Sequence, residues 1–200
     1  MIRIIGKIPK KVTVACSGGL DSMAVVDFLR KGKREISLAY FNHDTLHGRE
    51  AEAFVDAYAE RHSLPLLVGR MMSVKGKRSI EEYWRDERYS FLNRINSDFI
   101  VTCHHLDDCV ETWLMSSING FGKLIPHRRG DKIFRPFLMT SRSTIEGYAE
   151  KNSLSWIEDP SNQSNIYMRN YTRNVLMPHV LKINPGIKKT IRKKLIEKYQ

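Results

Sequence analysis

Short β-rich runs alternate with helical patterns up to residue 118, and this alternation restricts the fold more than any other feature of the sequence. Val and Leu are the commonest residues of these runs, and apolar side chains at helical spacing follow each run. The sequence predicts strands at residues 12–16, 36–41, 64–68 and 99–103. Strand and helix in regular succession require a parallel sheet with right-handed crossovers and helices on both faces. We therefore expect an α/β fold.

Helix and loop signals divide the remaining sequence. Ser79 followed by Glu82 fits a capping box that opens a helix through Ile95. A further helix is expected from His104 to Ile118, with Leu106, Val110, Trp113 and Leu114 on an apolar side that can pack on the sheet. Beyond residue 122 the pattern predicts an extended segment at 133–138, helices at 143–152 and 169–181, a loop at 156–165, and a short basic helix after Pro185-Gly186.

The positive charge of the chain is concentrated near its carboxyl end. Of a formal net charge of +11, residues 168–200 carry +8 and residues 1–167 carry +3. A basic segment on a nearly balanced body indicates a polyanionic partner, nucleic acid first, although a solubilising tail has the same composition. We expect a catalytic domain over residues 1–181 and a basic helical tail over residues 182–200.

Neither a membrane segment nor a disulfide framework is indicated. No run approaches the roughly 18 to 20 consecutive apolar residues that span a bilayer, and the amino end lacks the apolar core of a signal peptide. Cys16, Cys103 and Cys109 cannot all pair and form no Cys-x-x-Cys motif, so we interpret them as small core residues rather than metal ligands. A cytoplasmic location without membrane partners is expected.

A glycine loop joins the first predicted strand to the first helix. Its residues are Ser17, Gly18, Gly19, Leu20, Asp21 and Ser22. Adjacent glycines let backbone N–H groups face inward, and the following helix adds its positive end, so the loop suits phosphate oxygens. It lacks the lysine of a nucleoside-triphosphate P-loop and the spaced glycines of a dinucleotide loop. The two serines can donate to phosphate, and an acid beside an anion is best explained by Mg²⁺.

A second constellation begins after the fourth predicted strand. Its members, His104, Asp107, Asp108 and Glu111, follow the spacing of one helical face. Three carboxylates within two turns repel one another unless a cation lies among them, either Mg²⁺ or a substrate ammonium. Solvated acids near a helix amino end are the alternative explanation. Proximity to the glycine loop favours a functional role.

These motifs together resemble a known family. The 17–22 loop is similar to the pyrophosphate loop of the N-type ATP pyrophosphatases (PP-loop enzymes), and residues 104–112 look like the second motif of one branch, the tRNA(Ile)-lysidine synthetases. Residues 79–89 resemble that branch's Arg-Tyr-ending helix. Its late Asp-Pro-Ser-Asn and Arg-Asn signature is matched by residues 156–162 with Tyr167, Arg169-Asn170, Arg173 and Pro178. The resemblance covers about Val12 to Leu181 and implies the nucleotide α-hydrolase fold.

The resemblance implies an enzyme that uses ATP to adenylate the wobble cytidine of a CAU-anticodon tRNA(Ile), after which L-lysine displaces AMP. It implies pyrophosphate binding by Ser17 to Ser22, adenine near Asn42 and His43, and a further ATP contact from His104. Asp21, Asp107, Asp108 and Glu111 would be catalytic, with Mg²⁺ on Asp21 and Asp108 and the lysine ammonium on the acidic face. The expected phosphate or tRNA contacts are Arg85, Arg88, Arg169, Arg173, Lys188, Lys189, Lys193 and Lys194.

The sequence also departs from that family. Asp44 follows His43 where the family usually has glycine, and the Asn119-Gly-Phe-Gly122 loop lacks the family's arginine. Many members have further carboxyl-terminal domains that hold tRNA, so a minimal form is expected here, and a homodimer could supply the missing surface. The alternatives are another PP-loop tRNA-modifying enzyme such as a thiolase, a small-molecule synthetase, and a non-catalytic RNA-binding protein on the same fold.

Overall fold

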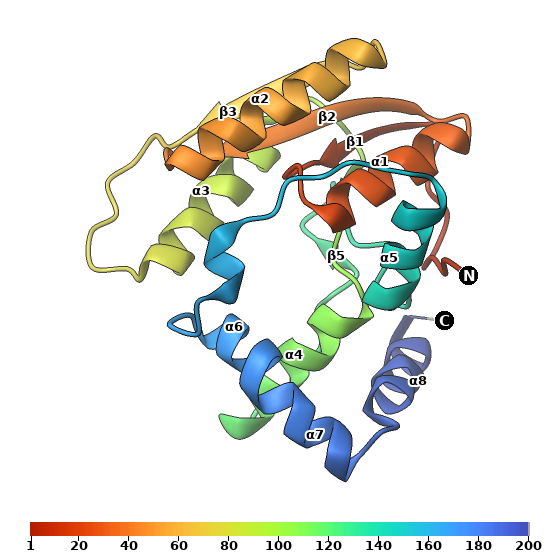
Figure 1. Ribbon diagram of the computed structural model, residues 1–200, viewed down its shortest axis with the longest axis vertical. Coiled ribbons are helices and arrows are strands. Elements are labelled where there is room, and N and C mark those ends of the chain that lie inside the picture. Colours follow the sequence, from red (N-terminus) through yellow and green to blue (C-terminus); the bar gives the residue numbers. More distant parts are fainter. Residues whose placement is uncertain (200) are drawn as a thin grey trace.

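The computed structural model describes residues 1–199, and its centre is a six-stranded sheet (Figure 1). The strand order is β3-β2-β1-β4-β6-β5. Every pairing is parallel except that of β5 with β6, so the expected parallel α/β architecture is confirmed. The bounds are β1 Lys11–Ala15, β2 Glu35–Asn42, β3 Leu66–Arg70, β4 Ile100–Thr102, β5 Arg128–Arg129 and β6 Ile133–Phe134.

Helices cover both faces of this sheet. Apolar side chains of α1 and α2 pack on Val12, Val14 and Leu38 at one face, and Tyr89 and Leu92 of α3 pack at the other. The helix bounds are α1 Leu20–Lys31, α2 Leu46–Arg61, α3 Ile80–Arg94, α4 Leu106–Ile118, α5 Arg142–Lys151, α6 Met168–Tyr171, α7 Met177–Ile183 and α8 Ile187–Tyr199. Within residues 1–199, no helix is both long and apolar enough to cross a bilayer.

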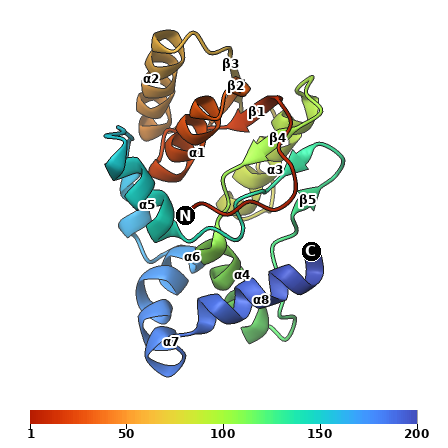
Figure 2. The same ribbon diagram turned by 90° about the vertical axis from the view of Figure 1, so that its right-hand side faces the viewer.

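The carboxyl-terminal helices form a second core with α4. Leu106 and Val110 of α4 are fully buried against Ile187, Ile191 and Leu195 of α8. Figure 2 shows α8 crossing α4 beside α7. The prediction that this side of α4 packs on the sheet is therefore wrong, because α8 presents its own apolar side at i, i+4 and i+8 and covers it. The division at residues 181 and 182 stays a prediction.

Other boundaries differ from the sequence predictions by small amounts. The strand expected at residues 64–68 runs from Leu66 to Arg70; its pairing with β2 starts where the N–H of Leu38 donates to the carbonyl of Pro65 and continues to Arg70. The segment expected as a loop at 156–165 contains a 3₁₀ turn, Pro160–Gln163, capped by Asp159. The helix predicted at 169–181 is confirmed as α6 and α7 joined by a π-helical turn, Thr172–Leu176.

Candidate active site

The glycine loop lies at the carboxyl end of β1, where ligands of parallel sheets bind. Gly18 has a φ of +79°, and a Cβ there would lie 3.2 Å from Cγ2 of Ile157, so only glycine fits. Gly19 precedes α1 and provides no side-chain cap. The first N–H groups of α1 therefore point at the loop without an intrahelical partner, as a phosphate site requires.

The two loop serines differ in their surroundings. The Ser22 hydroxyl donates to the carbonyl of Gly19 at 2.9 Å and accepts from the N–H of Ser17 at 3.2 Å. Its single proton is thus used inside the loop, and the side chain is buried. Ser17 is exposed. Ser22 consequently holds the loop in shape, while Ser17 can face a ligand.

His104 and His105 precede α4, and their positions differ from the sequence prediction. α4 begins at Leu106, so His104 lies outside it. The prediction that His104 shares a helical face with the three acids is therefore wrong. His105 caps the helix instead. Its Nδ1 accepts the N–H of Asp108 at 3.3 Å, and Oδ2 of Asp108 accepts the N–H of His105 at 2.9 Å. The two residues form a reciprocal capping box.

The acidic residues of α4 are neutralised by cations from the carboxyl-terminal segment. The buried carboxylate of Glu111 accepts from Nε and Nη2 of Arg173 at 2.7 and 3.0 Å, with Arg169 at 3.5 Å. Asp107 pairs with Lys188 of α8 and accepts the N–H of Arg142. The π-helical turn carries Arg173 toward α4, a placement often seen at functional sites. Cationic side chains of the protein therefore relieve the repulsion among the three carboxylates, a role that the sequence analysis gave to a bound cation.

Magnesium is the metal that the sequence resemblance implies, and its two expected ligands, Asp21 and Asp108, differ in fit. Oδ1 of Asp21 is shielded from solvent and accepts no hydrogen bond within residues 1–199. An orphaned carboxylate oxygen beside a phosphate loop suits Mg²⁺, which usually keeps several waters and substrate phosphates as its other ligands. Asp108 fits poorly, because Oδ2 accepts from His105 and Oδ1 lies 3.6 Å from Arg173. No group of three or more His, Cys, Asp or Glu residues suited to a metal occurs in the described chain.

Neutral imidazoles and a half-buried arginine line the neighbouring strand ends. Burial and the charge of Arg88 lower the pKa of His43 to about 4, and burial lowers the pKa of His104 to about 3, so both rings are neutral at pH 7. His43 packs between Phe41 and Trp84. Burial also lowers the pKa of Arg88, with further cationic repulsion from Arg85. A desolvated guanidinium among other cations is suited to an anionic ligand.

The loop after β2 is fixed by its own contacts. Nδ2 of Asn42 donates to Glu52 at 2.5 Å, and its Oδ1 accepts the N–H of Asp44 at 2.7 Å. Both ends of this amide are therefore occupied within the protein. Asp44 has a φ of +62°, the left-handed region that glycine favours and aspartate tolerates better than most residues. This conformation explains how Asp44 replaces the family's glycine.

Arg169 and Arg173 contact Glu111, and the other predicted basic residues lie on α3 and α8. Arg85 is exposed on α3 three residues before Arg88, so both lie on one side of that helix. Lys189, Lys193 and Lys194 are exposed on α8. Lys188 differs, since its ammonium contacts Asp107. The structure thus places Lys188 in the support of α4 and leaves the other three lysines facing solvent.

Sequence reasoning missed His105 and Arg135. Arg135 follows β6 and is only 3% exposed; it donates to the Pro126 carbonyl at 2.7 Å and to Oη of Tyr89 at 2.9 Å. Burial would raise the pKa of Tyr89, but the charge of Arg135 and its neighbours lowers it. An Arg-Pro pair directly after a short extended run was the available signal. For His105 the signal was a polar residue one position before an apolar helix start.

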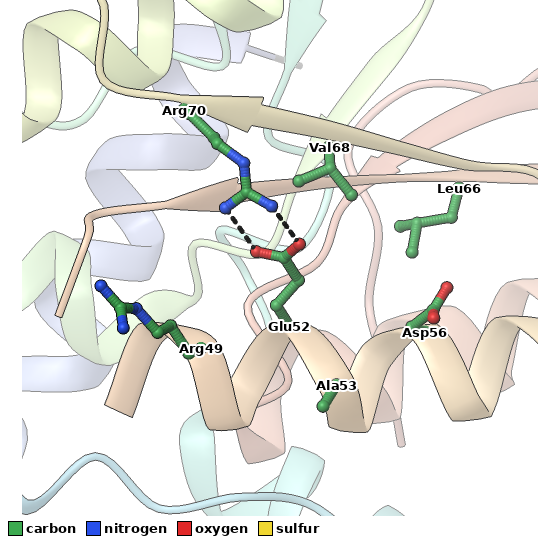
Figure 3. Close-up of a pocket in the computed structure, with 7 residues that line it drawn as sticks. All are labelled: Arg49, Glu52, Ala53, Asp56, Leu66, Val68 and Arg70. Atoms are coloured by element: carbon green, nitrogen blue, oxygen red, sulfur yellow. Dashed lines mark hydrogen bonds and ion pairs between the residues drawn. The ribbon is translucent and has the colours of Figure 1, made fainter. Parts of the chain in front are cut away.

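The groove between α2 and β3 lies apart from these residues. Its volume is about 420 Å³, and the Glu52–Arg70 ion pair, 2.6 Å long, crosses it (Figure 3). Leu66 and Val68 of β3 form one wall, and Arg49 and Asp56 of α2 stand on the other. None of the predicted site residues lines it. The chemistry indicated by the sequence is located at the strand ends instead.

Comparison with known proteins agrees with this geometry. The family model described as PP-loop domain matches residues 4–180. The chain is 31% identical to the tRNA(Ile)-lysidine synthase of Haemophilus ducreyi over 90% of its length and 34% identical to that of Geobacter sulfurreducens over 88%, and it spans 44% and 41% of those proteins. Among solved structures, the U34-tRNA thiolase NcsA of Methanococcus maripaludis, with its [4Fe-4S] cluster, has a TM-score of 0.71 at 21% identity, covering 96% of this chain and 74% of that one. The family match across residues 4–180, on a chain with a glycine loop at the end of β1 and an acid-bearing helix after β4, shows that the chain belongs to the PP-loop domain family.

Proposed function

We propose that the protein converts the wobble cytidine of a CAU-anticodon tRNA(Ile) to lysidine, using ATP and L-lysine. The observation that carries this proposal is similarity to tRNA(Ile)-lysidine synthases across about nine tenths of the chain, with the glycine loop and the acids of α4 intact. The chain spans less than half the length of those relatives. The complete lysidine-forming reaction is therefore proposed from the part of those relatives that this chain matches.

The first step would be adenylation. The cytosine ring carbonyl oxygen attacks the α-phosphorus of ATP, and the bond to pyrophosphate breaks. N–H groups at the start of α1 and the Ser17 hydroxyl would bind the departing pyrophosphate, and Arg88 would contact phosphate oxygens. Mg²⁺ held by Asp21 would supply charge neutralisation on the phosphates. No nucleophilic side chain is required.

Lysine addition would be the second step. A lysine amine attacks the activated ring carbon, AMP leaves with the ring oxygen, and the amine loses a proton. The acids of α4 are the candidate site for a lysine ammonium, and Asp108 is the most available of them. Its contacts with Arg173 and Arg169 are 3.6 and 4.0 Å long, whereas Glu111 and Asp107 have closer cationic partners.

A thiolase is the nearest alternative because a thiolase shares the fold. Cys16 and Cys109 are buried in the hydrophobic cores, and burial raises the pKa of both thiols, that of Cys109 to about 12. Such thiols are inert core residues rather than reactive or ligating thiolates. A non-catalytic RNA-binding protein is the other alternative, and it would have no use for the orphaned Asp21 carboxylate.

The assay that tests the proposal combines the protein with Mg²⁺, ATP, radiolabelled lysine and CAU-anticodon tRNA(Ile). We expect label in the RNA and release of pyrophosphate, both dependent on all components. A tRNA with another anticodon is the control. Pyrophosphate without label would contradict lysidine formation and retain an adenylating enzyme, whereas neither product would favour the RNA-binding alternative.

Replacing Lys189, Lys193 and Lys194 of α8 with glutamine should weaken tRNA binding and flatten its salt dependence. Each lysine that contacts a phosphate contributes roughly 0.7 to 0.9 to the slope of log affinity against log salt, so the slope should fall by about 2 to 3. The matched control removes the same charge at Lys7, Lys33 and Lys151, which are exposed elsewhere. Equal effects of the two triple variants on filter-binding affinity would show that α8 acts only through net charge.

A further inference from the structure

His105 occupies the space between the two chemical motifs. The side chain is 2% exposed, although the residue lies in a loop between β4 and α4. Its two ring nitrogens face different carboxylates. Nδ1 lies 3.5 Å from Oδ2 of Asp108, and Nε2 lies 3.6 Å from Oδ1 of Asp21 in the glycine loop. One buried ring therefore spans the distance from the start of α4 to the phosphate loop.

The helix cap determines which nitrogen carries the proton. Nδ1 accepts the N–H of Asp108, so in the neutral ring the hydrogen is on Nε2. Nε2–H then points toward Asp21, whose Oδ1 is shielded from solvent and accepts no hydrogen bond elsewhere in residues 1–199. At 3.6 Å the contact is longer than a hydrogen bond. Contacts of this kind are often long before substrate binds and shorten in the complex.

Helix stability does not explain a histidine at this position. Asparagine, aspartate and serine are the preferred capping residues, and each would accept the N–H of Asp108. Their side chains are too short to extend past the cap to a second element. The imidazole does both, because its two nitrogens lie on opposite sides of a rigid ring.

We propose that His105 is a positioning residue that holds the Asp21 carboxylate toward Mg–ATP while it caps α4. The proposal rests on the proposed function for its effect on turnover, but its effect on nucleotide binding is separate. His105 itself touches no substrate in this assignment. It acts through Asp21, and the loop and α4 are thereby kept in a fixed relation.

Two variants separate positioning from capping. His105→Asn keeps an acceptor near Nδ1 and loses the reach to Asp21, whereas His105→Gln keeps a donor near Nε2 and loses the cap. We expect His105→Asn to retain the wild-type Tm and to lower kcat for pyrophosphate release by about 10- to 100-fold, the usual effect of removing a supporting contact. His105→Gln should lower Tm by about 2 to 4 °C and retain more of kcat than His105→Asn.

A double-mutant cycle on Mg–ATP affinity, measured by calorimetry, gives a test that needs no turnover. His105→Asn should weaken Mg–ATP binding about 10-fold in the wild-type background and not at all in an Asp21→Asn background. Wild-type affinity and kcat in His105→Asn, or equal losses in both backgrounds, would overturn the proposal and leave His105 as a cap. If the wild-type protein binds Mg–ATP but releases no pyrophosphate with tRNA, the proposed function fails, and the affinity cycle still decides the role of His105.

Discussion

Asp21→Asn should lower the rate of pyrophosphate release at least about 100- to 1,000-fold and leave tRNA affinity nearly unchanged. The substitution preserves shape and removes one negative charge from a carboxylate oxygen that has no hydrogen bond within the described chain. Losing one preorganised electrostatic contact at a developing charge commonly costs a factor of this size. Asp21 lies in the glycine loop, whereas the exposed basic residues proposed to bind tRNA lie on α3 and α8.

The measurement is single-turnover pyrophosphate release, with tRNA binding followed in parallel. Asp56→Asn, an exposed acid on α2, makes the same chemical change outside the loop and should behave as wild type. A variant at Asp21 that turned over at the wild-type rate would remove the carboxylate from the mechanism. Equal loss of tRNA affinity would instead mean that the substitution had disturbed the tRNA surface.

Local sequence signals predicted the sheet and most helices because each signal belongs to neighbouring residues. The alternation of β-rich runs and helical spacing identified the first four strands, β1 to β4, to within about two residues. β5 was missed, since Arg128–Arg129 is two basic residues long and has no alternation to detect. The amino end of α4 was placed two residues early because spacing does not distinguish a capping residue in extended conformation, such as His105, from the first helical one.

The partners of the site residues could not be predicted in the same way. Glu111 and Arg173 are 62 positions apart, and the local sequence around either residue does not indicate that the two side chains pair. The sequence assigned the neutralising cation of the α4 acids to Mg²⁺ or a substrate ammonium, whereas the cations that contact them come from α6, the π-helical turn and α8. Long-range pairing depends on how α8 packs its apolar side on α4, which is a tertiary property.

Arg173→Ala should lower the free energy of unfolding by about 3 to 5 kcal/mol, the largest stability effect expected from a single substitution at this site. The Glu111 side chain is 3% exposed, and Arg173 makes two hydrogen bonds to it. Burial would lower the pKa of Arg173, but its bonds and charge contact with Glu111 raise it, so the charged pair is maintained. Removing one member leaves a buried charge without its closest partner, which costs far more than the pair itself contributes.

Arg169→Ala is the matched control for this pair. Its guanidinium lies 3.5 Å from Glu111 and its side chain is 39% exposed, so solvent screens the contact and we expect a loss of about 0 to 1 kcal/mol. Replacing Glu111 and Arg173 together by methionine should recover part of the stability lost in Arg173→Ala, because the buried Glu111 charge is removed with its partner, while Asp108, 3.6 Å from Arg173, still loses that cation. The measurement is the free energy of unfolding in urea for the wild type, Arg173→Ala, Arg169→Ala and the double methionine variant. If Arg173→Ala were as stable as Arg169→Ala, Glu111 would have to be reached by water or by Arg169, and the pair would contribute to substrate binding rather than to the fold.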